Sequence, residues 1–386
     1  MKITTSFQQL LICLLLLITN GAVSAQKQFK LIVNLPAEID KSNIEFYLED
    51  GKSNFKMKSV SASGNQLTAT GEYFGLYAAI NIQRPQVGSA ESFVNTFFVQ
   101  EKTGIITFSK KDPSDLSLNN YSLENVEDFK EEKQSRKKHS SKELKDAIDF
   151  EAVYLASIIY GTDMAITNKH NDLLKALGRK DIEYINAHLN SYYSFYFFKN
   201  DISVSSRLPG DSLMMVFNKF PEKYRLSDEG NLCLQFIVGR STFTGNETPI
   251  EFSARDIHGK NIRLADYRNK KMVLLHFWGT WCSPCIEELP ALKKIREQYR
   301  PDQLEIISIT VSSKDSDFFR IIKKYEMDWS HIHNNDDLYY IYGAMGTPRI
   351  CLINKDLKVI YDSVTPGKED NLTLTKLNKM LSETLH

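Results

Sequence analysis

The order of apolar and helical segments in the final third of this chain restricts the possible folds more than any other feature of the sequence. An apolar segment, MVLLHFW at 272–278, leads into a helical pattern that starts at Pro284. Another apolar segment follows at 304–311, then a helix near 318–325, and then the segments RICLINK and KVIYDS and a C-terminal helix. A strand–helix–strand unit that is followed by two strands and a helix is typical of an α/β layer with a mixed sheet. We therefore predict an α/β domain at 244–386.

The segments upstream of this domain have other periodicities. Residues 29–110 contain short apolar or alternating runs separated by turn-rich stretches, which is the pattern of a small β-sandwich or barrel. Apolar residues then recur at helical spacing, and the aromatic side chains of SYYSFYFF are expected to form a core face. A chain of 386 residues is long enough for such a division. The sequence predicts a small β-rich domain at 26–120 and a helical connecting segment at 121–243.

The N-terminus has the layout of a secretory signal peptide. Lys2 supplies a positive charge, residues 10–18 form a short apolar run, and small residues end it at Val23 and Ala25. This pattern predicts that residues 1–25 are removed and that the mature protein lies in the periplasm or cell envelope. The alternative is an uncleaved N-terminal membrane anchor, although the run is shorter than the roughly 20 residues that a spanning helix needs.

The balance of acidic and basic residues does not indicate a partner that the protein binds through net charge. The chain has 48 Lys and Arg residues and 48 Asp and Glu residues, so its formal net charge at pH 7 is +0. A neutral chain offers no electrostatic reason to bind nucleic acid or an anionic membrane surface. We therefore expect no nucleic-acid partner.

Four cysteines remain after the signal peptide, and only Cys282 and Cys285 are close in sequence. A structural zinc site needs four Cys or His ligands, usually as two close pairs, and a second pair is missing because Cys233 and Cys351 lie far apart. A structural bridge between Cys282 and Cys285 would close a very short loop and would stabilise the fold little. We expect no metal and no cofactor, and we expect Cys233 and Cys351 to be buried and inert.

The spacing of the pair suits reversible redox chemistry. At a helix N-terminus, free backbone N–H groups and the helix dipole stabilise a thiolate, and the pKa of a cysteine placed there falls to about 3.5–7.5, against about 8.5 for a free thiol. Cys282 comes first and is expected to be the exposed nucleophile. Cys285 lies one turn further and is expected to attack the mixed disulfide and release the product. Pro284 suits the first helical turn, where its missing N–H costs little.

These residues carry a resemblance to a known family. The segment VLLHFWGTWCSPC resembles the active-site strand and turn of thioredoxin-fold proteins, and more closely those of the TlpA/ResA type of exported thiol–disulfide oxidoreductase. The likeness covers about residues 247–386. It implies a thioredoxin-like fold for this domain, protein disulfides as substrates and a membrane or periplasmic thiol as electron donor. It also leaves a role in cytochrome c biogenesis open.

The β-rich and helical segments have a weaker likeness. They resemble an uncharacterised domain that precedes the redox module in many exported proteins of Bacteroidota, and they carry no motif with a known chemistry. We expect them to act as a spacer or a docking platform.

The resemblance of the redox module also implies roles for individual residues. Pro290 matches the proline within the family's active-site helix, and Glu288 falls where this family places an acidic residue near the buried thiol. GTPRICLI matches the loop with the family's cis-proline, which implies that the Thr347–Pro348 bond is cis and lies beside the cysteine pair. Together with Trp281, this loop is expected to contact the substrate.

His276 departs from the family pattern, because thioredoxins carry a buried aspartate at this position. A histidine within an apolar strand is usually a satisfied core residue. It is nevertheless expected near Cys285, so Glu288 and His276 are both candidates for the group that accepts the proton of this thiol. The sequence leaves this choice open, as it does the direction of electron flow.

Two other functions compete with that of an oxidoreductase. A peroxidase of the peroxiredoxin class is the enzyme alternative, but that class has a Pro-x-x-x-Thr-x-x-Cys arrangement, whereas Thr280 lies directly before Trp281 and Cys282 with no such proline ahead of it. A binding module with a vestigial redox site is the other alternative, and the intact cysteine pair argues against it. The leading hypothesis is a thiol–disulfide oxidoreductase that reduces protein disulfides.

Overall fold

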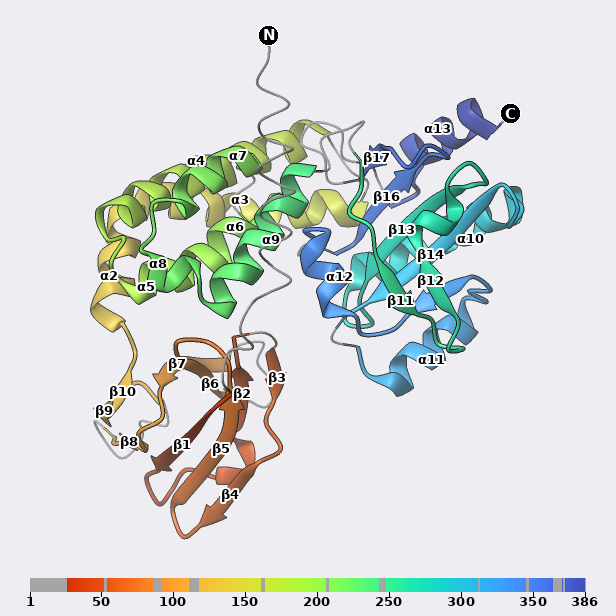
Figure 1. The fold of residues 1–386 in the computed structure, drawn as a ribbon. Coiled ribbons are helices and arrows are strands. Elements are labelled where there is room, and N and C mark those ends of the chain that lie inside the picture. Colours follow the sequence, from red (N-terminus) through yellow and green to blue (C-terminus); the bar gives the residue numbers. More distant parts are fainter. Residues whose placement is uncertain are drawn as a thin grey trace. The chain divides into compact units, whose positions relative to one another are not determined.

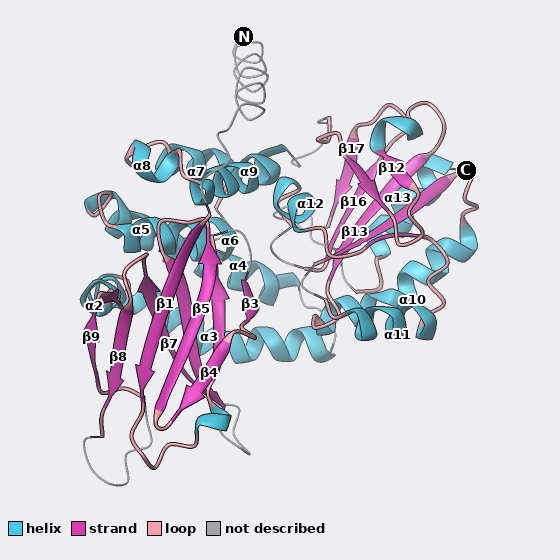
Figure 2. Cartoon of the chain, turned by 60° about the horizontal axis from the view of Figure 1, so that its bottom comes forward, coloured by secondary structure: helices cyan, strands magenta, loops and turns pink. Residues whose placement is uncertain are grey.

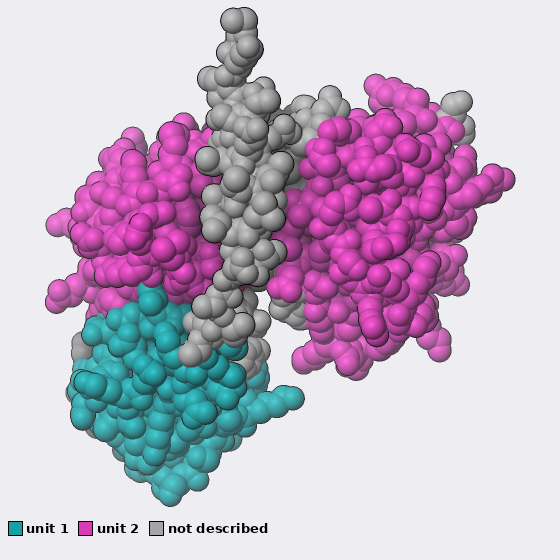
Figure 3. All heavy atoms as spheres, in the orientation of Figure 1, with its two compact units in different colours: residues 1–128 teal, residues 129–386 magenta. Residues whose placement is uncertain are grey.

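The computed structural model describes residues 26–51, 54–85, 92–110, 118–160, 164–205, 208–242, 248–311, 313–344, 347–363, 370 and 372–385. The chain forms two compact units, residues 1–128 and residues 129–386 (Figure 3). The predicted signal peptide lies outside the described residues, as does the predicted boundary between the helical segment and the α/β domain. Among the helices in the described part, none is both long and apolar enough to cross a membrane.

The first unit is a sandwich of two five-stranded sheets. One has the order β4-β5-β1-β8-β9, with strands β1 (Lys27–Asn34), β4 (Val60–Ser63), β5 (Gln66–Tyr73), β8 (Gly104–Phe108) and β9 (Tyr121–Glu124). The other has the order β10-β7-β6-β2-β3, with strands β2 (Glu45–Glu49), β3 (Asn54–Lys56), β6 (Ala78–Pro85), β7 (Ser92–Val99) and β10 (Val126–Glu127). Alternate residues of both sheets, such as Leu31 and Ile80, are fully buried in one shared core. The predicted β-rich fold is confirmed.

The sandwich extends beyond residue 120, the end of the β-rich domain that the sequence predicted. β9 pairs with β8 and β10 pairs with β7, so the chain remains in the two sheets as far as Glu127. These strands lie in the polar stretch YSLENVE, in which only Val126 is buried. Pairing with distant strands, rather than a local apolar pattern, determines their structure.

The second unit begins with a helical region. Its helices are α2 (Lys130–His139), α3 (Ser141–Tyr160), α4 (Met164–Ala187), α5 (Tyr192–Phe197), the π-helix η2 (Phe198–Ile202), α6 (Ser203–Ser205), α7 (Gly210–Phe217), α8 (Glu222–Arg225) and α9 (Asp228–Thr242). The aromatic residues predicted to form a core face do so. Phe195 and Phe198 are fully buried, and Phe195 stacks on Tyr224 with ring centroids 5.2 Å apart.

The rest of the second unit is an α/β layer around a five-stranded mixed sheet (Figures 1 and 2). The strand order is β15-β14-β13-β16-β17, with β13 (Met272–Trp278), β14 (Leu304–Thr310), β15 (Ser330–Ile332), β16 (Arg349–Ile353) and β17 (Val359–Asp362). The other elements are β11 (Ser253–Arg255), β12 (Asn261–Arg263), η3 (Leu264–Tyr267), α10 (Ser283–Gln298), α11 (Asp315–Lys324), α12 (Asp336–Ile341) and α13 (Thr375–Leu385). β13, β14 and β15 are parallel, whereas β16 is antiparallel to β13 and β17. The predicted mixed sheet and thioredoxin-like layer are confirmed.

Both faces of this sheet are covered, and every residue of β13 is therefore buried. Leu274 and Trp278 face a core that they share with α10, α11 and α13. Val273 and Leu275 face a second core with β12, η3 and α12. Because side chains alternate along a strand, His276 lies on the same face as Leu274 and Trp278, under α10.

Candidate active site

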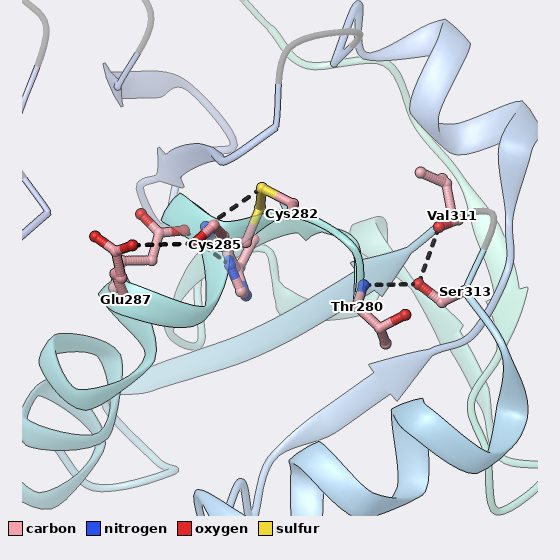
Figure 4. Close-up of a disulfide and its surroundings, with 9 residues drawn as sticks. Thr280, Cys282, Cys285, Glu287, Val311 and Ser313 are labelled. Carbon is pink, nitrogen blue, oxygen red and sulfur yellow. Dashed lines mark hydrogen bonds and ion pairs between the residues drawn. A yellow bond between two sulfur atoms is a disulfide. The ribbon is translucent and has the colours of Figure 1, made fainter. Parts of the chain in front are cut away.

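Cys282 and Cys285 lie at the start of α10 and are joined by a disulfide (Figure 4). Cys282 is the N-cap residue, and its sulfur accepts a hydrogen bond from the backbone N–H of Cys285 at 3.3 Å. Pro284 lies in the first helical turn, as predicted. The pair is thus placed where free backbone N–H groups and the helix dipole favour a thiolate.

The two sulfurs differ in exposure less than the sequence predicted. Cys282 was expected to be exposed, but only 5% of its surface is accessible in the disulfide, against 0% for Cys285. The N-cap geometry turns the Cys282 sulfur toward the first turn of the helix, and this buries it. The prediction of an exposed nucleophile is therefore wrong for the oxidised protein. The exposed neighbour is Trp281, at 60%.

A loop that is distant in sequence fixes the turn before Cys282. The backbone N–H of Thr280 donates to Ser313 Oγ at 3.0 Å, and this hydroxyl donates to the carbonyl of Val311 at 3.0 Å (Figure 4). The backbone N–H of Ser313 in turn donates to Asn334 Oδ1 at 2.9 Å. Ser313 and Asn334 were not predicted from the sequence, because no local pattern connects their loops to the cysteine pair.

Glu288 and His276, the two candidates for the proton acceptor, are in contact. Glu288 Oε1 lies 3.0 Å from His276 Nε2, and their side chains are 4% and 0% exposed. Because Glu288 is three residues after Cys285 in α10, its carboxyl group shares the helix face of that thiol. Burial raises the pKa of Glu288, and the hydrogen bond with His276 opposes this shift. A buried carboxyl group whose pKa is raised is suited to accept a proton from a neighbouring group.

His276 has a second partner that the sequence did not indicate. Its Nδ1 atom lies 3.0 Å from Ser308 Oγ, and the indole Nε1–H of Trp329 donates to the same oxygen at 2.8 Å. Ser308 lies directly opposite His276 in the register of β13 and β14. The two residues are neighbours only because of this strand register, and the sequence of either strand alone does not reveal the register.

The peptide bond between Thr347 and Pro348 is cis, as the resemblance implied. β16 begins at the next residue, and its Arg349 pairs with Phe277 of β13, so the bond lies at the end of the sheet from which the chain enters the cysteine turn. Thr347 Oγ1 is buried and has no hydrogen-bond partner among the described residues. Pro290 lies inside α10, as predicted.

The other two cysteines of the described chain, Cys233 and Cys351, are free and buried. Burial raises the pKa of Cys233 to about 12 and also raises the pKa of Cys351. Both thiols therefore stay protonated at neutral pH, and their predicted burial is confirmed. Within the residues that the structure describes, no group of three or more His, Cys, Asp or Glu side chains could hold a metal ion.

The α/β layer is similar in sequence to known redox proteins. Residues 244–362 match the AhpC/TSA family. Over 119 residues the chain is 34% identical to the thiol-disulfide oxidoreductase ResA of Bacillus thuringiensis subsp. konkukian (strain 97-27), and this match covers 31% of the chain and 68% of the relative. Over 134 residues it is 28% identical to the ResA of Bacillus subtilis (strain 168), with 33% of the chain and 74% of the relative covered.

A solved structure is similar as well. It is the thioredoxin domain of a thiol-disulfide oxidoreductase from Bacteroides vulgatus, with 19% sequence identity and a TM-score of 0.30, and the match covers 35% of this chain and 96% of that domain. The cysteine pair, the cis-proline and the mixed sheet lie within residues 244–362, the region that matches the AhpC/TSA family. Through this region the chain belongs to the family of ResA-like thiol–disulfide oxidoreductases.

Proposed function

We propose that the protein is exported and that its Cys282–Cys285 couple reduces protein disulfides. The observation that carries the proposal is the disulfide across the first turn of α10, with the buried Glu288–His276 pair behind it. This arrangement supplies a thiolate that the helix N-terminus stabilises and a base for the second thiol. Membership of a thiol–disulfide oxidoreductase family supports the reaction type.

The first step is an attack by the Cys282 thiolate of the reduced protein on one sulfur of the substrate. The substrate S–S bond breaks, a mixed disulfide with Cys282 forms, and the second substrate sulfur leaves as a thiolate that takes a proton from water. Because the thiolate is the nucleophile, the N-terminal N–H groups of α10 increase the fraction of Cys282 that can react.

Cys285 completes the reaction. Its thiol gives a proton to Glu288 and attacks the Cys282 sulfur, so that the mixed disulfide breaks and the substrate leaves with both of its sulfurs reduced. Two electrons have then passed to the substrate, and the Cys282–Cys285 disulfide remains. Without a base the buried Cys285 would keep its proton, because apolar surroundings disfavour a thiolate.

The substrate is proposed to bind against Trp281 and the cis-proline loop. Trp281 is 60% exposed directly before Cys282 and offers a large apolar surface to an incoming chain. Thr347 and Pro348 lead into β16 at the same end of the sheet. An extended segment of a substrate protein can pair with backbone of this kind, so recognition would depend more on main-chain contacts than on one side chain.

We propose that the β-rich domain and the helical segment serve as a docking platform or spacer for the redox domain at 244–386. In the second unit, the helical region packs closely on the α/β layer. A Cβ atom at Gly239 of α9 would lie 2.3 Å from the carbonyl oxygen of Ile341 in α12, so these helices meet backbone to backbone. This close packing supports a fixed platform for the redox domain rather than a loose tether.

Export after cleavage behind Ala25 and a membrane or periplasmic thiol donor complete the proposal. A reductase in an oxidising compartment needs such a donor to return Cys282 and Cys285 to the dithiol state. Trapping of the thiols in living cells tests this direction. Largely reduced thiols are expected, and a pair that is always oxidised would contradict the role of a reductase.

The reaction itself is tested by insulin reduction with a dithiol donor, run beside a peroxide-consumption assay. The wild type is expected to accelerate insulin reduction and to leave peroxide unconsumed, whereas Cys282→Ser should turn over neither insulin nor peroxide. Cys351→Ala, which removes a buried thiol outside the couple, is the matched control and should behave as the wild type. Peroxide consumption without insulin reduction would identify a peroxidase. A lack of both activities would identify a binding module.

A further inference from the structure

Ser308 is a fully buried hydroxyl residue on the face of the sheet that carries the cysteine pair. Within the described residues its Oγ atom has two hydrogen-bond partners, Trp329 Nε1 at 2.8 Å and His276 Nδ1 at 3.0 Å. An indole N–H can only donate, so Ser308 Oγ accepts this bond. Among the residues that the structure describes, the hydroxyl proton of Ser308 then has one acceptor in reach, which is Nδ1 of His276.

This hydrogen-bond pattern fixes the tautomer of His276. When Nδ1 accepts from Ser308, the ring proton is on Nε2, and Nε2–H donates to Glu288 Oε1 at 3.0 Å. In the other tautomer Nδ1–H would donate to Ser308, and the hydroxyl proton of Ser308 would be buried without an acceptor. The cost of such an unpaired donor shifts the equilibrium about tenfold or more toward the Nε2–H tautomer.

The same contacts disfavour a second proton on the imidazole ring. An imidazolium carries protons on both nitrogens, and its Nδ1–H would again leave the Ser308 hydroxyl proton without an acceptor. Glu288 therefore accepts a hydrogen bond from a neutral ring, which favours the ionised carboxylate. Of the two buried groups, Glu288 is then the one that is ready to take a proton.

We propose that Ser308 is a positioning residue for proton transfer at Cys285: it holds His276 as the neutral Nε2–H tautomer and so keeps Glu288 as the proton acceptor. This inference rests on the proposed function, because it concerns the step in which Cys285 attacks the mixed disulfide. The proton leaves the Cys285 thiol and binds the Glu288 oxygen that His276 does not occupy. Trp329 acts one contact further away, because its N–H holds the Ser308 oxygen in place.

Other ionisable groups face Glu288 from the neighbouring elements. The charge of Asp370, which precedes α13, raises the pKa of Glu288. Tyr361 of β17 donates to Asp370 at 2.8 Å and keeps its proton, because burial raises its pKa. His331 of β15 lies opposite Ser308 and stays neutral at physiological pH, because burial lowers its pKa to about 4. None of these groups contacts the Ser308 hydroxyl, so a change at Ser308 reaches Glu288 through His276.

The test compares Ser308→Ala with Ser330→Ala. Ser330 lies in β15 and its hydroxyl donates to Glu305 at 2.8 Å, so this control removes a donor hydroxyl from the same sheet without a contact to His276. Reduced protein is mixed with dithiobisnitrobenzoate, and the release of the second coloured thiol reports the attack by Cys285. This release is measured as a function of pH.

Ser308→Ala is expected to move the release profile to higher pH and to slow release about tenfold on its acid side. Without the Ser308 hydroxyl, His276 can adopt the Nδ1–H tautomer, in which Nε2 carries no proton. A protonated Glu288 can then donate to this Nε2. This hydrogen bond stabilises the protonated acid, so Glu288 becomes available as a base only at higher pH. Ser330→Ala should keep the wild-type profile. Ser308→Thr, which restores a hydroxyl group, should return the profile toward that of the wild type.

The nitrogen chemical shifts of the His276 ring give a readout that a loss of stability does not move. The wild type should show the Nε2–H tautomer near neutral pH, and Ser308→Ala should show a mixture. An Nδ1–H tautomer or a charged ring in the wild type would overturn the proposal, as would an unchanged release profile in a folded Ser308→Ala protein. A protein that shows the expected tautomer and release profile but fails to reduce insulin would refute the proposed function and leave this inference standing.

Discussion

Each face of the thioredoxin-like sheet buries a pair of ionisable side chains, and the two pairs are built differently. On the face that carries α10, Glu288 and His276 share a hydrogen bond of 3.0 Å. On the opposite face, Arg349 donates to both carboxylate oxygens of Asp362, at 3.0 and 2.7 Å. Its Nη1 also donates to two backbone carbonyls of the segment that follows α12. The Glu288–His276 bond depends on which ring nitrogen carries the proton. Arg349 instead makes four hydrogen bonds with fixed donors, two to Asp362 and two to the backbone.

The two pairs therefore suit different roles: the pair on the α10 face suits proton transfer, and the pair on the opposite face suits stabilisation of the fold. Burial works against the charge of Arg349, but the attraction of Asp362 outweighs it, and the pKa of Arg349 is raised. Both charges of that pair are matched, so a proton transfer between them gains nothing. Burial also raises the pKa of Glu288, and His276 offers this carboxyl group one ring hydrogen bond rather than a fork of fixed donors, so the carboxyl group can take up a proton. We assign proton transfer to the first face and structural support to the second.

The largest expected effect is on the first face. Cys282→Ser removes the nucleophile, and turnover of insulin should fall to background. Serine is a good N-cap residue, so α10 and the fold should remain intact.

Cys285→Ser should instead trap mixed disulfides with substrates through Cys282, which non-reducing electrophoresis of cell extracts detects. Multiple turnovers by Cys285→Ser with no trapped species would mean that the roles of the two cysteines are wrongly assigned.

The next largest effect is expected on the second face. Arg349→Met should lower the free energy of unfolding by about 3–5 kcal/mol, because it leaves the Asp362 carboxylate buried without its partner. Denaturant unfolding of the oxidised protein measures this loss. The double variant Arg349→Met with Asp362→Leu should recover most of it, because two apolar side chains need no charged partner. If the single variant is as stable as the wild type, the second face does not have the structural role that we assign to it.

A smaller but kinetic effect is expected at Glu288. Glu288→Gln should slow the attack by Cys285 about 100-fold near neutral pH, within the range that a general base contributes. Glutamine still accepts a hydrogen bond from His276 but cannot take up a proton. His276→Asn should have the smaller effect on the rate and the larger effect on stability. An unchanged pH profile in Glu288→Gln, with a collapsed one in His276→Asn, would make the histidine the base.

Glu288→Gln should also be more stable than the wild type at neutral pH. The pKa of Glu288 is raised in the folded protein above its ordinary value of 4.5, so the folded state holds this proton more tightly than the unfolded state. The stability that Glu288 contributes is therefore fully present below its unfolded pKa and is lost as the pH rises through the folded pKa. Glutamine does not titrate, so the gain should grow from acid to neutral pH. Thermal unfolding at several pH values checks the sign, and a variant that loses stability toward neutral pH would contradict it.

Local patterns were sufficient to predict the elements that carry the cysteine pair. The apolar run at 272–278 is β13, and Pro284 lies in the first turn of α10. The position of Glu288 on the helix face of Cys285 follows from their spacing. Each of these features depends on residues within a few positions of one another, which is the range over which a periodic pattern carries information.

The partners of these residues could not be predicted, because they depend on the register of distant strands. Ser308 meets His276 only because β13 and β14 pair with these two residues opposite, and a shift of one residue would turn Ser308 to the other face. Ser313 reaches Thr280 from a loop that follows a different strand. The burial of Cys282 was missed for another reason, since it follows from the N-cap geometry of its own sulfur.

The smallest effect is expected at Cys351, whose sulfur lies on the second face, 3.8 Å from Asp362 Oδ1. Cys351→Ala should lower the free energy of unfolding by about 1 kcal/mol, because it removes a buried sulfur atom and leaves a small cavity. Turnover of insulin should not change, because burial raises the pKa of this thiol and keeps it protonated. Denaturant unfolding and the insulin assay measure the two quantities on one preparation.

Alkylation of the reduced native protein makes the same comparison without a substitution. A thiol reagent reacts with thiolate that it can reach, so Cys282 should be labelled first, and Cys351 and Cys233 should be labelled only as the protein unfolds. Addition of denaturant is the positive control, because it should expose both buried thiols at once. Rapid labelling of Cys351 in the native state would mean that a reactive thiol lies on each face of the sheet. The face that carries Arg349 and Asp362 could then no longer be assigned a purely structural role.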